Sequence, residues 1–172
     1  MYRVKALVLA GLACATLLGA TGIANAEDIQ GVIVRTLVLS ENTRLVGDVT
    51  CTVTGAPCIT FGAAHIVLNL NGFTISGQAD AALGCKGALV ASEPGISTNG
   101  QGEVGIRGPG IVQRFQGDGI LFIATAKGWV QGVATMTNCM SGIRINPTSS
   151  EISVEGNVSV RNGTSSNPCG GI

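Results

Sequence analysis

Few side chains in this sequence have the type and spacing that acid–base or metal chemistry requires. The only histidine is His65, and Glu151 and Glu155 form a pair of carboxylates four positions apart. On a β-strand such a pair is usually solvated rather than catalytic. Asp118 stands alone between two glycines, which is typical of a corner turn. The sequence therefore predicts no catalytic residue, no metal ligand and no cofactor.

Cysteines are the other reactive side chains, and six are present. Cys51 and Cys58 flank Gly55–Pro57, and a turn at this segment would bring the two thiols together. We expect a structural disulfide between them, because a metal site would need more ligands at short spacing. The sequence leaves the partners of three further cysteines open: Cys85, Cys139 and Cys169.

The first 26 residues have the pattern of a secretory signal peptide. Arg3 and Lys5 precede an apolar run over 6–20, which is short for a membrane span. Ala24–Ala26 is a small-x-small cleavage site, so we expect cleavage between Ala26 and Glu27. The mature chain would be periplasmic, secreted or held at the cell surface, without a membrane span. Five cysteines would remain in it, and an oxidising compartment favours their pairing.

The composition excludes two classes of protein. Basic and acidic residues are balanced at 10 each, so the chain lacks the basic excess that a nucleic-acid partner requires. Hydrophobic residues make up 45% and charged residues 12%, which is too apolar for a disordered chain. The length of 172 residues is consistent with a single domain after the leader.

The elements that must position these side chains form a repeat. Short β-rich runs recur with glycine between them, and equivalent first runs begin at Val104, Trp129 and Ile152, which gives sequence steps of 25 and 23. The Gly-Ile runs at Gly119 and Gly142 also differ by a step of 23. Three short strands in a unit of about 23 residues are typical of a solenoid. Apolar and polar residues alternate within the runs, which predicts one inward face.

The unit that begins at Ile66 is longer, because the step from Ile66 to Val104 is 38. We assign the extra residues to a loop over Ala91–Gly102, which is rich in Ser, Gly and Asn. The third strand of this unit is then expected at Gly87–Val90. Glycines are expected to form the corners between strands, since they adopt conformations that a Cβ would block.

These runs resemble a known superfamily. The segment His65–Gly77, HIVLNLNGFTISG, resembles the opening repeat of right-handed parallel β-helix proteins of the pectate-lyase-like superfamily. Gly119–Ile123 and Gly142–Ile145 resemble its recurring Gly-Ile third strand. The resemblance implies an all-β fold with about four coils of three short strands over 65–172, preceded by a capping β region at 27–64. An antiparallel β-sandwich is the alternative, since it also has short strands between turns.

Enzymes of this superfamily cleave polyuronides with acidic clusters, often with Ca²⁺, and with a basic residue. Arg107 and Pro109 approximate the lyase pattern Arg-x-Pro-x-x-Arg, but the next arginine is Arg114, two positions too far along. The hydrolase members use paired aspartates and a Gly-His-Gly element, whereas His65 follows two alanines. The resemblance therefore implies the fold without a catalytic constellation.

Equivalent outward positions in successive coils are expected to lie about 4.8 Å apart. Asn69, Arg107, Gln131 and Glu155 take such positions on the first strands and would form a polar column that could bind sugar hydroxyls. Ordinary solvent-facing polarity is the alternative. Sugar sites usually add an aromatic ring, and Trp129 is the only tryptophan, expected at an inward or strand-start position.

Two functions are consistent with these patterns. The first is an exported, noncatalytic β-helix domain that binds polysaccharide or serves as a surface scaffold. The alternative is the N-terminal part of a polysaccharide lyase or glycoside hydrolase whose catalytic coils follow Ile172. The sequence stops at Gly171-Ile172, where a third strand has just begun, so we expect an incomplete last coil. With Val158 and Val160 pointing inward, this coil is expected to self-associate through its unpaired edge.

Overall fold

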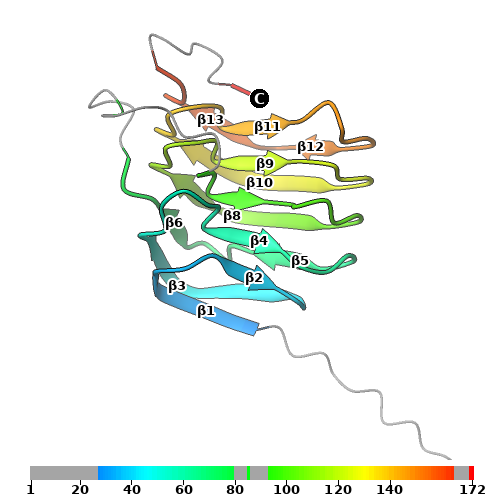
Figure 1. Ribbon diagram of the computed structural model, residues 1–172, viewed down its shortest axis with the longest axis horizontal. Helices are drawn as coiled ribbons and strands as arrows, with labels where there is room; N and C mark the ends of the chain where they lie inside the picture. The colour runs from blue at the N-terminus through cyan, green and yellow to red at the C-terminus, as the bar shows by residue number, and fades with distance from the viewer. Residues whose placement is uncertain (1–26, 80–84, 86–92, 165–170) are drawn as a thin grey trace, which may run out of the picture.

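The computed structural model describes residues 27–79, 85, 93–164 and 171–172. Within these residues the regular structure consists of strands alone, arranged in two parallel sheets of eight and five strands (Figure 1). This part of the chain is therefore all-β, and its parallel pairing excludes the antiparallel sandwich. The described residues include no helix that could span a membrane.

The larger sheet contains six strands in a continuous order and two short strands beside them. The order is β1 (Glu27–Ile33), β3 (Thr43–Cys51), β5 (Val67–Asn69), β8 (Gly105–Gln113), β10 (Trp129–Met136) and β12 (Ser153–Glu155). Of the two short strands, β6 (Thr74–Ser76) pairs with β3 and β8, and β13 (Val158–Val160) pairs with β10.

The smaller sheet is formed by the strands that lie between these in the sequence. They are β2 (Leu37–Leu39), β4 (Ile59–Phe61), β7 (Ile96–Ser97), β9 (Ile120–Phe122) and β11 (Ile143–Ile145). The chain thus passes from one sheet to the other and back, and each pass adds the next parallel strand to both sheets (Figure 1). The region 27–64, predicted to be a cap, contributes β1–β4 to one end of these same sheets.

The repeat predicted from the sequence is present in the strand register, with one correction. Trp129 pairs with Gly105 on one side and with Ser153 on the other, so the two steps are equal, whereas the sequence pattern predicts 25 and 23. In the smaller sheet Ile120 pairs with Ile143, which is the predicted step of 23. The difference arises because the apolar runs at Val104 and Ile152 begin one residue before their strands, whereas Trp129 is the first residue of β10.

The first and second predicted runs of each unit belong to the same sheet. β8 and β10 each extend through both runs, and a shift of register between Gln131 and Val133 marks the boundary. Gly132 lies at this boundary with φ of +69° and bends the strand without ending its pairing. Each unit therefore contributes its first two runs to the larger sheet and its third run to the smaller sheet.

The longer unit is corrected in a similar way. Its strand in the smaller sheet is β7, which pairs with β4 and with β9. The strand expected at Gly87–Val90 lies outside the described residues. Part of the predicted loop Ala91–Gly102 is therefore strand, and the extra residues precede it. The sequence carries the signal, because Gly95-Ile96 repeats the Gly-Ile start of Gly119-Ile120.

Inward-facing apolar side chains from both sheets form one core. Ile66, Leu68 and Leu70 are buried while Val67 and Asn69 are partly exposed, as the alternation predicted. The largest fully buried side chains come from nearly every pass of the chain: Phe61, Phe122, Leu39, Leu45, Ile59, Leu68, Leu70, Ile75, Ile96, Ile106, Ile120 and Ile143. Burial of this apolar surface is the main force that holds the two sheets together.

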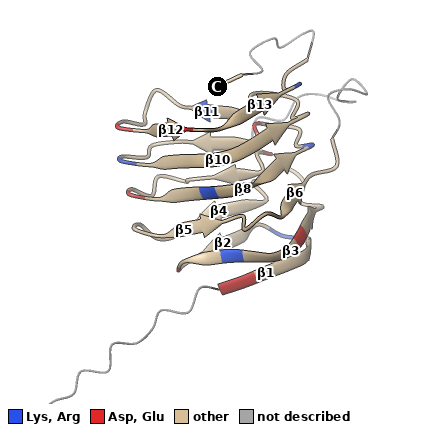
Figure 2. Ribbon diagram, turned by 180° about the vertical axis from the view of Figure 1, so that it is seen from behind, with Lys and Arg blue, Asp and Glu red and all other residues tan. Residues whose placement is uncertain are grey.

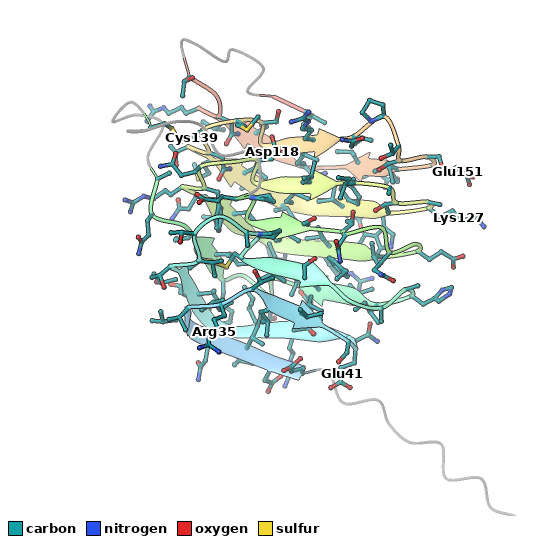
Figure 3. All side chains as sticks on the ribbon, in the orientation of Figure 1. Arg35, Glu41, Asp118, Lys127, Cys139 and Glu151 are labelled. Atoms are coloured by element: carbon teal, nitrogen blue, oxygen red, sulfur yellow. A yellow bond between two sulfur atoms is a disulfide. The ribbon has the colours of Figure 1, made fainter. Side chains whose placement is uncertain are left out.

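Glycine forms fewer of the corners than predicted. The corner that leads from the smaller sheet back to the larger one has a left-handed residue in four successive passes, and none of the four is glycine: His65, Glu103, Lys127 and Glu151. Figure 3 shows Lys127 and Glu151 at the same end of the sheets. Their side chains project into solvent, and His65 Nδ1 lies 3.0 Å from Glu103 Oε2.

The last strand of the larger sheet is oriented differently from the prediction. Ser159 pairs with Thr135, which is fully buried, so Ser159 faces the interior. Val158 and Val160 therefore point outward, with exposed fractions of 55% and 36%. The sequence is misleading here because the inward-facing residues of β10 and β13 at this position, Thr135 and Ser159, are polar. Hydrophobicity therefore no longer marks the inner face.

Candidate functional site

The four residues of the predicted polar column lie in register on the outer face of the larger sheet. Asn69 of β5 pairs with Arg107 of β8, Arg107 pairs with Gln131 of β10, and Gln131 pairs with Glu155 of β12. Arg107, Gln131 and Glu155 are exposed, and Asn69 is half-buried. The stacking of parallel strands thus brings together four side chains that are far apart in the sequence.

Two further residues extend this line of side chains toward β1. Arg44 pairs with Asn69, and Asp28 pairs with Arg44. Arg44 Nε donates to Asp28 Oδ1 at 2.6 Å, and this hydrogen bond lowers the pKa of the Asp28 carboxyl. Figure 2 shows these charged positions on β1, β3 and β8 from the side of the larger sheet. The ion pair neutralises this end of the column, so the polar groups available to a ligand lie nearer to β10.

Trp129 lies beside the polar column. It begins β10 and is two residues from Gln131, so the two side chains share the outer face of the sheet. Its indole lies across Gly105 of the neighbouring strand, where an added Cβ would fall on the ring. The guanidinium carbon of Arg107 lies 5.4 Å from the ring centroid, in the range of a cation–π contact.

This placement decides between the two positions that the sequence allowed for Trp129. It is a strand-start residue and is half-buried on the outer face, not an inward core residue. The alternation of β10 contains the signal, because Val130 is fully buried and its neighbours on both sides must then face outward. An aromatic ring is therefore part of the polar surface.

A hollow of about 250 Å³ lies between β10 and β12 at this point. Its lining residues are Trp129, Val130, Gln131, Ser153 and Glu155. Ser153 Oγ donates to Glu155 Oε1 at 2.7 Å, which fixes the carboxylate at the rim. An aromatic ring, an amide, a hydroxyl and a carboxylate around a shallow hollow can bind a polar ligand that also has an apolar face.

Asp118 is a second candidate, because it is a fully buried carboxyl at the corner before β9. Its Oδ1 accepts a hydrogen bond from the Ser141 amide at 2.9 Å. Within the described residues Oδ2 accepts no hydrogen bond and lies 3.8 Å from Arg144 Nη1. Burial raises the pKa of Asp118, and the Ser141 hydrogen bond and Arg144 oppose this rise only in part. The carboxyl has no exposed surface that a ligand could reach, so this geometry indicates a structural role.

The raised pKa predicts a pH dependence of stability. An unfolded aspartate titrates near pH 3.9, and the folded state holds its proton to higher pH. The contribution of Asp118 to stability is therefore greatest below about pH 4 and is lost as pH rises through the raised pKa. We expect the free energy of unfolding of Asp118→Asn to fall less between pH 4 and pH 7 than that of the wild type.

Urea denaturation at several pH values would measure this difference. Asp118→Asn retains an oxygen for the Ser141 amide, so it removes the charge and keeps the hydrogen bond. Glu151→Gln is the matched control, because it removes an exposed carboxylate from another corner. Equal pH dependence in the wild type and Asp118→Asn would show that Asp118 has an ordinary pKa.

The other residues that suggested chemistry remain apart. Glu151 and Glu155 are both exposed, and His65 contacts only Glu103 among ionic partners that are described. Arg107 is on the outer face of β8, whereas Arg114 lies beyond its end, and Arg114 Nε donates to the Ala79 carbonyl. Within the described residues no three His, Cys, Asp or Glu side chains are grouped as metal ligands.

Two disulfides are present in the described part of the chain. Cys51 and Cys58, the pair expected from the sequence, are bonded with their Cα atoms 6.0 Å apart. Cys85 and Cys139 form a second bond that the sequence left open, with Cα atoms 5.9 Å apart. Cys169 lies outside the described residues. The second bond was not predictable from spacing, because its ends are 54 positions apart.

Comparisons of the chain with protein-family models, with curated proteins and with solved structures found no match.

Proposed function

We propose that this chain is an exported, noncatalytic right-handed parallel β-helix of the pectate-lyase-like kind. The chain passes from one parallel sheet to the other and back, and this topology supports a β-helix. The right-handed assignment is supported by the rule that connections between parallel strands are right-handed in nearly all proteins. The predicted signal peptide and the two disulfides support export.

The proposed activity is the binding of polysaccharide by the outer face of the larger sheet. The observation that carries it is the placement of Trp129 beside the polar column, where the register sets Arg107, Gln131 and Glu155 on adjacent strands. Regularly spaced polar groups suit a polymer of hydroxylated units, and an indole can pack against the apolar face of a sugar ring. The second candidate, a lyase or hydrolase, lacks an observation that favours it.

Trp129→Ala tests this proposal. We expect the full-length protein to bind at least one soluble polysaccharide from a broad panel, as measured by isothermal titration calorimetry, and to release no cleavage products. Loss of the indole should weaken this binding about fivefold, since an aromatic contact of this kind contributes on the order of 1 kcal/mol.

Ile111→Ala is the matched control, because Ile111 is a half-buried apolar residue of β8 in the same sheet. It pairs with Ala134 of β10, on the other side of the register shift from Gln131. Its binding should equal that of the wild type. Absence of binding to every polysaccharide, or equal losses in the two variants, would contradict the proposed binding. Release of shorter chains would contradict the noncatalytic assignment.

A further inference from the structure

The hollow beside Trp129 has a single formal charge on its lining. Glu155 supplies that charge, while Trp129, Gln131 and Ser153 are neutral. The Glu155 side chain is exposed, and its Oε1 is held by Ser153 Oγ at 2.7 Å. A ligand seated against the indole therefore meets a fixed carboxylate, which accepts hydrogen bonds and donates none.

Arg107 does not offset this carboxylate inside the hollow. Gln131 separates the two residues, since it pairs with Arg107 on one side and with Glu155 on the other. Two strand spacings place their backbones about 10 Å apart. The guanidinium is also directed over the indole, 5.4 Å from the ring centroid, and is absent from the lining of the hollow.

The polar groups of the hollow match hydroxyls better than carboxylates. Glu155 can accept two hydroxyl hydrogens of a sugar, and the Gln131 amide can donate to one sugar oxygen and accept from another. A uronate placed in the same position would set its carboxylate against that of Glu155. It would lose a charge-assisted hydrogen bond and gain a repulsion between like charges.

We propose that this hollow selects uncharged pyranose units and excludes uronates, with Glu155 as the residue that determines the specificity. The inference rests on the proposed polysaccharide binding and adds the class of sugar. It also separates this chain from enzymes that act on polyuronides, because the one charge on the lining of the hollow, that of Glu155, has the sign that repels their substrates.

Binding of two oligosaccharide series of equal length tests the selection, one uncharged and one of uronates. We expect the wild type to bind the uncharged series about tenfold more tightly, the loss expected for one hydrogen bond to a charged group. Glu155→Gln should bind both series with similar affinity, because the amide removes the repulsion and retains an acceptor. Glu155→Lys should prefer the uronates.

Glu151→Lys is the matched control, since it makes the same change of charge four positions away at an exposed corner outside the hollow. It should keep the preference of the wild type. The inference is overturned if the wild type prefers uronates, or if Glu151→Lys shifts the preference as far as Glu155→Lys does. If neither series nor any other polysaccharide binds, the proposed function itself fails.

Discussion

The variant Cys85→Ala/Cys139→Ala is expected to lose about 4 kcal/mol of the free energy of unfolding. The bond joins residues 54 positions apart, and a cross-link stabilises mainly by restricting the unfolded chain, more strongly for longer loops. It connects the segment before β7 to the corner after β10, where Cys139 is fully buried. The loss should be seen in denaturant titrations followed by Trp129 fluorescence.

Cys51→Ala/Cys58→Ala is the comparison that isolates loop length. This bond closes a loop of only seven positions, so its removal should cost about 2 to 3 kcal/mol. All four cysteines are buried, so the two double variants disturb similar surroundings. A larger loss for the short loop, or equal losses, would show that native packing rather than chain restriction sets the contribution of these bonds.

Phe122→Ala is expected to lower the free energy of unfolding by about 3 to 5 kcal/mol. The side chain is fully buried in β9, near the middle of the core. A Cβ placed on Gly128 would lie 2.9 Å from the ring, so the surroundings are tightly packed. Strands on both sides of β9 hold their positions, and the cavity therefore cannot collapse easily.

Leu121→Ala in the same strand is the control for this prediction. Leu121 points to the outer face and is half-buried, so its truncation leaves no enclosed cavity and should cost about 1 kcal/mol or less. Circular dichroism during urea titration would measure both variants. Similar losses at 121 and 122 would contradict the assignment of β9's inner and outer faces.

The sequence determined the local features of this protein, because they depend on near neighbours in the chain. Alternation predicts Leu68 inside and Asn69 outside, and the repeat by itself aligns Gln131 with Arg107, as the strand register confirms. The parallel, all-β arrangement follows from the same repeat. A period of about 24 residues is long enough to cross to a second sheet and return, and stacking then sets equivalent residues side by side.

Only the tertiary structure decided features that depend on contacts between distant segments. The Cys85–Cys139 bond joins an insertion to a corner, and no local pattern relates the two positions. Alternation places Trp129 on the outer face, but only the strand pairing sets its indole across Gly105 of the preceding pass, which leaves room for the ring. Val158 and Val160 face outward because Ser159 continues a polar inner column. Hydrophobicity alone cannot predict such orientations, since the free energy of burying a side chain depends on the side chains that the neighbouring strand packs against it.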